Sequence, residues 1–189
     1  MFIQTEETPN PNSLKFFPGE EFNDKGPINF STEDEASISP LAEALFTVSG
    51  VENVFFGLDF VTVTKSKNSQ WDGIKSAILL LMMQHFSSKT PTYYEFKHRD
   101  VNANQINDSD SEIVKQIKEV LEHRVRPAVA QDGGDIIFHK FEDGILTLEL
   151  HGACSGCPSS TVTLKNGIES MLRHYVPEVT EVVALNQEL

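Results

Sequence analysis

The amino-acid sequence predicts an α+β protein made of two small α/β-layer domains that are joined by a linker. Short runs rich in β-branched and aromatic residues alternate with longer segments of helical periodicity. This periodicity is lost between residues 87 and 108, and the elements that follow run in the order α-β-β-α-β. We therefore assign residues 1–86 to an N-terminal domain, 87–108 to the linker and 109–189 to a C-terminal domain.

The N-terminal domain begins with two predicted strands, "FIQTE" and "SLKFF", on either side of the turn-rich "TPNPN". A helix follows at Pro40 with Ser39 as its N-cap, because proline is favoured at the first helical position. The runs "VENVFF" and "FVTVT" predict a hairpin around residues 57–59. A longer helix covers residues 69–86, and five apolar residues form its inward stripe: Trp71, Ile74, Ile78, Leu81 and Met82. This stripe indicates a hydrophobic core.

The linker has little apolar periodicity and ends in a polar tract of Asn, Asp and Ser residues. Its first half contains Tyr93, Tyr94 and Phe96. These aromatic residues indicate that this half docks on the N-terminal domain.

The C-terminal domain begins with a capping box formed by Ser109 and Glu112. The helix behind it ends or kinks at Pro127, and "DGGD" at residues 132–135 turns the chain. Two strands, "DIIFHKF" and "ILTLEL", flank a turn at residues 142–144, and "TEVVAL" closes the domain as a strand. Apolar residues form one face of each predicted helix: Ile113, Ile117, Leu121 and Val125 in the first, and Leu164, Ile168, Met171, Leu172 and Tyr175 in the second.

Composition excludes several classes of function. The chain carries a formal net charge of -13, so no basic field is available for nucleic acid, and no nucleic-acid partner is expected. The longest aliphatic run, residues 78–83, is far shorter than the roughly 20 apolar residues of a membrane span, so no membrane partner is expected either. The N-terminus resembles neither a secretory signal nor an Arg-rich presequence, which predicts a reducing compartment.

The candidate site is the loop "HGACSGCPSS", which contains Cys154 and Cys157, the only two cysteines of the chain. Pro158 is suited to the first position of a helix, so Cys157 is predicted to be its N-cap. Cys154 then lies one glycine turn earlier, in a loop outside the core. Free backbone N–H groups and the helix dipole would favour the thiolate form of both side chains.

An isolated CxxC pair has four interpretations. A structural disulfide would close only a short loop in a compartment that is predicted to be reducing. A thioredoxin-type redox pair normally follows a βαβ pattern, whereas an antiparallel hairpin is predicted here. Zinc requires four ligands, and this loop supplies two, with His151 as a candidate third. An iron-sulfur cluster normally takes four thiolates, which a twofold dimer of this chain would supply.

The C-terminal domain resembles the Nfu family of iron-sulfur scaffold or carrier proteins, which are related to the C-terminal domain of NifU. The resemblance is carried by three stretches, "RPAVAQDGGDI", "GACSGCPSSTVTLKNGIESML" and "VPEV". The resemblance covers about residues 110–185. The stretch "MFIQTEETPNPNSLKFFPG" is similar to the N-terminal domain that accompanies this module in mitochondrial and alphaproteobacterial members.

The resemblance implies a [4Fe-4S] cluster that bridges two protomers and is passed to client apoproteins; a [2Fe-2S] form stays open. Cys154 and Cys157 match the ligand positions, and Gly152, Gly156 and Pro158 match the residues that shape the loop. The aspartates of the "DGGD" segment are expected only to build a turn and cap. The partners would be a donor scaffold, client apoproteins and, with cluster bound, a second copy of the chain.

Two functions follow from the same cysteines. The first is a non-enzymatic cluster carrier without catalytic residues. The alternative is a thiol-disulfide oxidoreductase in which Cys154 is the nucleophile and Cys157 the resolving thiol. The initiator Met favours a bacterial, alphaproteobacterial cytoplasmic protein, with the mitochondrial matrix as the alternative location. The N-terminal domain lacks cysteines and recognisable catalytic motifs, so its expected role is docking of a client or donor.

Overall fold

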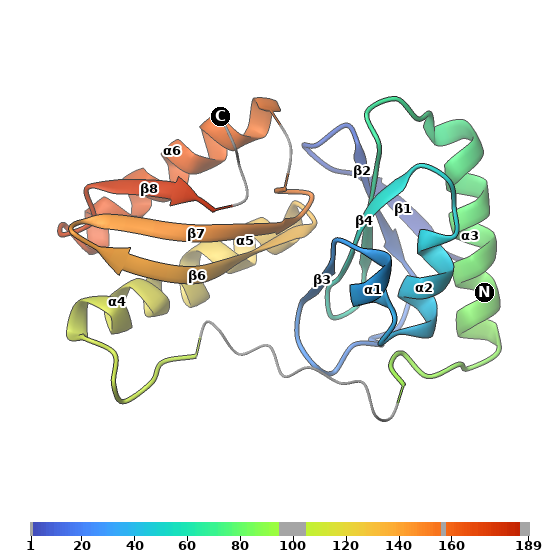
Figure 1. Cartoon of the computed structure of the whole chain (residues 1–189), viewed down its shortest axis with the longest axis horizontal. Helices are drawn as coiled ribbons and strands as arrows, with labels where there is room; N and C mark the ends of the chain where they lie inside the picture. The colour runs from blue at the N-terminus through green and yellow to red at the C-terminus, as the bar shows by residue number, and fades with distance from the viewer. Residues whose placement is uncertain (1, 95–104, 156–157, 186–189) are drawn as a thin grey trace. The chain divides into compact units, whose positions relative to one another are not determined.

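The computed structural model describes residues 2–94, 105–155 and 158–185, with only the backbone for 158–164. The chain divides into two compact units, residues 1–101 and 102–189 (Figure 1). Both contain a sheet and helices, so the predicted α+β class is confirmed. No helix within the described ranges is long and apolar enough to cross a membrane.

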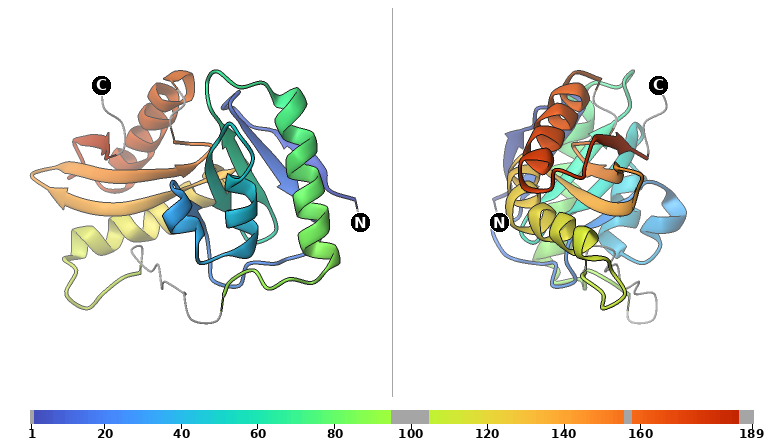
Figure 2. Two further views of the ribbon diagram at one scale, coloured as in Figure 1. Left: turned by 45° about the vertical axis from the view of Figure 1, so that its right-hand side comes forward. Right: turned by 90° about the vertical axis from the view of Figure 1, so that its left-hand side faces the viewer.

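The N-terminal unit is built on an antiparallel five-stranded sheet in the order β1-β2-β5-β4-β3. Its elements are β1 (Gln4–Glu7), β2 (Ser13–Phe17), β3 (Ile28–Phe30), α1 (Glu33–Ala36), α2 (Pro40–Phe46), β4 (Val51–Phe56), β5 (Val61–Lys65) and α3 (Trp71–Ser87). Alternate residues of the central strands, such as Phe16 and Val63, share one core with residues of α2 and α3. This alternation places the helices on a single face of the sheet (Figure 2).

Local sequence signals account for most of this unit. Ser39 caps α2 as predicted, because its Oγ accepts a hydrogen bond from the Ala42 backbone N–H at 3.3 Å. The stripe of α3 is confirmed in part: Ile74, Ile78 and Met82 are buried, whereas Trp71 and Leu81 are only partly buried.

Two short elements of the N-terminal unit, β3 and α1, were not predicted. Helix α1 has a capping signal, since Thr32 Oγ1 accepts from the Glu35 N–H at 3.2 Å while the Glu35 carboxylate accepts from the Ser31 N–H at 2.6 Å. However, α1 spans four residues and β3 three, which is too short to produce a detectable apolar period.

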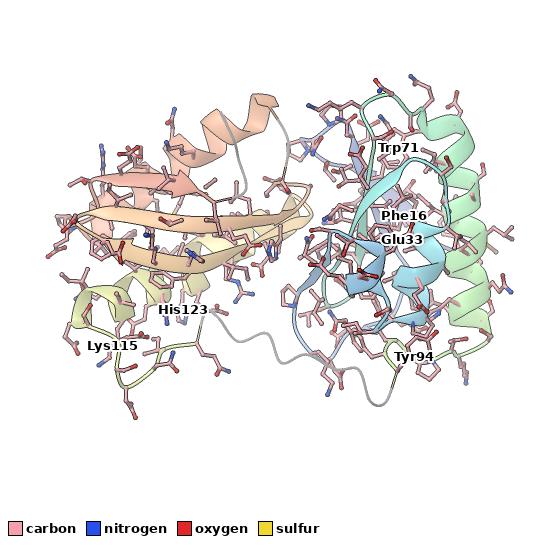
Figure 3. The ribbon with its side chains drawn as sticks, in the orientation of Figure 1. Phe16, Glu33, Trp71, Tyr94, Lys115 and His123 are labelled. Carbon is pink, nitrogen blue, oxygen red and sulfur yellow. The ribbon has the colours of Figure 1, made fainter. Side chains whose placement is uncertain are left out.

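Residues 92–94 contact the N-terminal unit. The Thr92 hydroxyl donates to the Phe22 carbonyl at 2.8 Å, and the Tyr93 hydroxyl donates to Asn23 Oδ1 at 2.8 Å. The Tyr94 hydroxyl, labelled in Figure 3, donates to Glu43 Oε2 at 2.8 Å. The start of the segment interpreted as a linker is therefore attached to this unit, whereas Phe96 lies outside the described residues.

The C-terminal unit has a three-stranded sheet in the order β6-β7-β8, in which β6 and β7 are antiparallel and β7 and β8 parallel. Its elements are α4 (Glu112–Val120), a π-helical turn η1 (Leu121–Val125), α5 (Arg126–Gln131), β6 (Gly134–Glu142), β7 (Ile145–Gly152), α6 (Pro158–Tyr175) and β8 (Glu181–Ala184). The helical segment from α4 to α5 and helix α6 both lie on one face of this sheet (Figure 2). Their apolar residues and those of the sheet form a second core. The predicted order α-β-β-α-β is confirmed, with three consecutive pieces in place of the first helix.

The first helix differs from its prediction at both ends. Its N-cap is Ser111, whose hydroxyl accepts from the Val114 N–H at 3.3 Å, so the predicted cap at Ser109 is wrong. Near its end, Pro127 lacks an N–H, and the turn just before it widens into η1. Met171 and Tyr175, predicted to face the core, are 36% and 43% exposed, while Ile168 and Leu172 are buried.

Candidate functional site

The cysteine loop connects β7 to α6. Strand β7 ends at Gly152 and α6 begins at Pro158, as the position of the proline predicted. Gly152 has a positive φ of 62°, and its carbonyl accepts from the Ser155 N–H at 3.1 Å, which forms the glycine turn before the cysteines. Gly156 and Cys157 lie outside the described residues, so the structure places only Cys154 of the predicted ligand pair.

Cys154 is buried in the second core. Its exposed fraction is 4%, and it belongs to the same apolar cluster as Leu150, Val129 and Ile168. The prediction that this loop lies outside the core is therefore wrong for Cys154. Sequence periodicity could not show this, because Cys154 lies in the connection between the end of β7 at Gly152 and the start of α6 at Pro158.

The space for the Cys154 side chain is provided by Gly134, the second glycine of the "DGGD" segment. A methyl group at Gly134 would place its carbon 2.6 Å from Cys154 Sγ and 2.6 Å from the His151 carbonyl oxygen. Both distances are well below van der Waals contact. The φ angle of Gly134 lies outside the left-handed region, unlike that of Gly133, which is 85°. Gly134 is therefore needed for its small size and Gly133 for its backbone conformation.

The turn before Gly134 also holds the cysteine loop through the main chain. The Ala153 N–H donates to the Gly133 carbonyl at 3.1 Å, one residue beyond the end of β7. In the β6–β7 ladder, Gly134 pairs with Gly152 and Asp135 with His151. The "DGGD" segment thus lies directly beside the residues that lead into the cysteine loop.

A partly buried ion pair between Arg126 and Asp135 fixes the start of β6 to α5. Arg126 donates from Nε to Asp135 Oδ1 at 2.8 Å and from Nη2 to Asp135 Oδ2 at 2.9 Å. The side chains are 20% and 4% exposed, and Arg126 also donates to Glu122. Burial alone would lower the pKa of Arg126, but its hydrogen bonds and charge interactions with Asp135 and Glu122 raise it above the usual value.

This pair was missed in the sequence, where the aspartates of the "DGGD" segment were expected only to form a turn and cap. That interpretation fits Asp132, which is the C-cap of α5, and is wrong for Asp135. The available signal was the separation of nine residues between Arg126 and Asp135, which spans one short helix and one turn. This spacing alone does not specify a contact.

His151, the candidate third zinc ligand, interacts with a carboxylate. Its Nε2 lies 2.9 Å from Glu149 Oε1 on the same strand, and its side chain is 14% exposed. Within the part of the chain that the structure describes, no three His, Cys, Asp or Glu side chains are grouped so that they could hold a metal ion. Thiolates are soft ligands that suit zinc or iron-sulfur clusters. Of the two predicted thiolate ligands, the structure describes only the side chain of Cys154.

Two family models match the chain, and together they cover both units. Residues 3–89 match the model described as "Scaffold protein Nfu/NifU N terminal", and residues 117–183 match the NifU-like domain. The second match includes the cysteine loop, Gly134 and the ion pair.

Curated relatives extend over nearly the whole chain. It is 48% identical over 184 residues to "NFU1 iron-sulfur cluster scaffold homolog, mitochondrial" of Drosophila persimilis. The aligned region is 96% of this chain and 64% of the relative. It is 50% identical over 184 residues to "NifU-like protein 4, mitochondrial" of Arabidopsis thaliana, covering 96% of this chain and 65% of the relative. The chain thus spans somewhat less than two thirds of these relatives.

Among solved structures, the solution NMR structure of a NifU-like protein from Saccharomyces cerevisiae is similar. The TM-score is 0.46 and the sequence identity 28%, over 50% of this chain and 86% of that one.

Proposed function

This chain belongs to the Nfu family of iron-sulfur cluster scaffold proteins, and we propose that it is a non-enzymatic carrier of a [4Fe-4S] cluster. Cys154 and Cys157 of each of two protomers would ligate the cluster, which is the cargo of the protein. A donor scaffold would supply the cluster, and client apoproteins would receive it by exchange of thiolate ligands.

The observation that carries this proposal is the number and spacing of the thiols. The 189 residues contain two cysteines, separated by two residues in the connection between β7 and α6. Since a cluster normally takes four thiolates, two copies of this loop complete one ligand set. A cluster shared between two protomers would also permit stepwise replacement of its ligands by the thiolates of a client.

The proposal is tested by anaerobic reconstitution of the full chain with iron and sulfide. The expected product is a brown dimer with about four iron atoms, because four thiolates ligate one cubane cluster. Binding only to the paired state should also shift the chain from monomer to dimer by mass action. Sedimentation and Mössbauer spectroscopy measure these two results and distinguish a [4Fe-4S] from a [2Fe-2S] product. A colourless monomer would contradict the proposal.

The oxidoreductase alternative receives no support from the comparisons, because the family model and the two relatives are named as iron-sulfur scaffolds or NifU-like proteins. An insulin-reduction assay on the same preparation tests this alternative directly. Catalytic reduction by a chain that takes up no iron would favour the enzyme over the carrier.

For the N-terminal unit we propose a docking role toward clients or the donor. Removing residues 1–101 should leave the iron content after reconstitution unchanged, because both cysteines lie in the other unit. Transfer to a client apoprotein should slow by about tenfold, which corresponds to a loss of ~1.4 kcal/mol of docking free energy. Release to a small chelator requires no docking and serves as the control. Equal transfer rates to several clients, with and without this unit, would contradict the role.

The names of the relatives favour the mitochondrial matrix over the bacterial cytoplasm that the sequence analysis preferred. Both relatives described above are called mitochondrial. We therefore propose the mitochondrial matrix as the compartment of this chain. Fractionation of the source cells with an antibody to the chain tests this assignment.

A further inference from the structure

Helix α3 presents a second set of apolar side chains to solvent. Its inner side packs on the sheet of the N-terminal unit through Ile74, Ile78 and Met82, which are buried (Figure 2). On the opposite side Leu80 is 67% exposed and Met83 41% exposed. With about 100° of rotation per residue, the residues within about 60° of Leu80 form the outer face of α3. They are Gly73, Ser76, Ala77, Leu80, Met83, Gln84 and Ser87.

This outer face is uncharged in a strongly acidic chain. None of its residues is Asp, Glu, Lys or Arg. It lies within residues 73–94, the longest stretch without an acidic residue in a chain that has 28 of them. A helix on the surface of a globular protein normally carries charged residues on its solvent side. An uncharged side with exposed Leu and Met side chains therefore indicates a contact with another molecule.

We propose that the outer face of α3 binds the same face of a second copy of the chain, with the two helices antiparallel and a twofold axis at Leu80. A twofold contact uses one patch on both copies, so the patch must complement itself. In this arrangement each residue meets the one that lies equally far on the other side of Leu80. The resulting pairs are Met83 with Ala77, Gln84 with Ser76, and Ser87 with Gly73.

The outer face complements itself in size. Met83 is opposite Ala77, so the longer side chain of one copy meets the methyl group of the other. A methyl group added at Gly73 would meet no atom within 4 Å of its own chain, which leaves the space above Gly73 open to Ser87 of the second copy. The small residues gather in the first half of the face and the long ones in the second. Two antiparallel helices can therefore approach at the lower end of the usual axial distance of about 8–10 Å.

The charge of the chain also favours a second copy at this face. Two chains with a net charge of -13 each repel one another, and this repulsion is strongest where carboxylates face each other. In the antiparallel arrangement Asp72, at the edge of the outer face, is opposite Ser88. No carboxylate of this helix then faces another. The outer face of α3 is thus a surface at which two acidic chains can meet.

The contact is small, so we expect it to be weak. Helix α3 has 17 residues and is about 25 Å long. One face of such a helix buries less than the ~1,200 Å² of total area at which stable interfaces begin. The inference goes beyond the proposed carrier function and does not depend on it. Cargo that is shared by two copies would hold them together and strengthen the contact.

The first test is disulfide cross-linking in the full chain with Cys154→Ala and Cys157→Ala, which leaves no thiol. Ser76→Cys and Gln84→Cys are made in separate chains, and both positions are exposed. The chains are mixed with diamide, which is reduced as it oxidises two thiols to a disulfide, and intact mass spectrometry identifies the products. The mixed dimer should form at least about tenfold faster than either dimer of like chains. Positions 76 and 84 meet, whereas equal positions lie about 12 Å apart along the helix.

Leu58→Cys in the same thiol-free chain is the matched control. Leu58 is 55% exposed and belongs to the same unit but not to α3, so its cross-linking measures random encounters. A mixed dimer that forms as slowly as the Leu58→Cys dimer would overturn the proposal and leave a helix of a client or donor as the occupant of this face. Like dimers that form as fast as the mixed dimer would overturn the antiparallel arrangement.

A second test uses the natural cysteines, so it does not depend on the folding of the thiol-free chain. Sedimentation equilibrium of the reduced, cluster-free chain should show weak self-association at concentrations up to about 1 mM. Leu80→Glu places two carboxylates at the twofold axis and should weaken this association at least about tenfold. Because Leu80 is 67% exposed, the substitution should leave the fold intact.

Leu58→Glu changes the net charge by the same amount away from α3, and it should leave the association unchanged. An equal effect of Leu58→Glu and Leu80→Glu would show that only net charge matters, and it would overturn the proposal. A chain that stays monomeric up to about 1 mM would also overturn it. Neither test involves iron, so their results are separate from those of the carrier function.

Discussion

Replacing Cys154 by Ala is expected to abolish stable cluster binding, lowering the iron content from about four atoms per dimer to almost none. Each protomer would then supply one thiolate, and two thiolates per dimer do not hold a cubane cluster. Iron and sulfide analysis after anaerobic reconstitution, with sedimentation for the dimer, measures the effect. The same loss is expected for Cys157→Ala, because this substitution also leaves one thiolate in each protomer.

The burial of Cys154 makes the choice of substitution important. Serine would place a hydroxyl group in the apolar cluster around Leu150, at a cost of about 1–3 kcal/mol, whereas alanine avoids this cost. Both variants should lose the cluster, and only Cys154→Ser should show the larger loss of stability. Ser155→Ala changes the neighbouring residue without removing a thiolate, so it should retain the iron. Full iron content in Cys154→Ala would show that the ligand assignment is wrong.

Replacing Asp135 by Asn should destabilise the C-terminal unit by about 2–4 kcal/mol, because it leaves Arg126 partly buried without its main counter-ion. The lower end of the range applies if Glu122 compensates, since Arg126 also donates to that residue and is itself 20% exposed. Hydrogen exchange of the β6 and β7 amides measures the stability of this unit. High salt should change the result little, because partly buried charge pairs are screened much less than exposed ones.

The chain provides two controls for this experiment. Trp71, its only tryptophan, lies in the N-terminal unit, so its unfolding transition should be the same in the variant. Lys140→Gln removes the exposed contact between Lys140 and Glu142, and its effect should be far smaller. An Asp135→Asn variant as stable as Lys140→Gln would contradict a stabilising role for the Arg126–Asp135 pair.

The sequence predicted the elements whose signals are local and repeated. Helix α6 begins at Pro158, as predicted, and extends through Tyr175, the last residue of its predicted apolar face, and β2 and β4 were also found where expected. Elements without a full period were missed, as for β3 and α1. The first helix of the C-terminal unit was given the wrong N-cap, because Ser109 and Ser111 both precede it and only Ser109 has Glu112 three residues later.

The candidate site was predicted only as far as its position along the chain. The loop between β7 and α6 was expected, but the contact of Cys154 with Gly134 depends on the register in which Gly134 pairs with Gly152. The Arg126–Asp135 pair likewise depends on how α5 packs beside β6. Neither relation is contained in a local pattern. The roles of both cysteines as ligands stay predictions.

The strand order of the N-terminal unit has a consequence for its synthesis. Strands β1 and β2 form one half of the sheet and β3 and β4 the other, and β5 alone joins them, pairing with β2 and with β4. The side chains of Ser13 and Thr64, which meet across this junction, are 51 residues apart in the chain. Until Val61–Lys65 has left the ribosome, the nascent chain therefore carries two unpaired strand edges, the condition in which partly made sheets are most prone to aggregate.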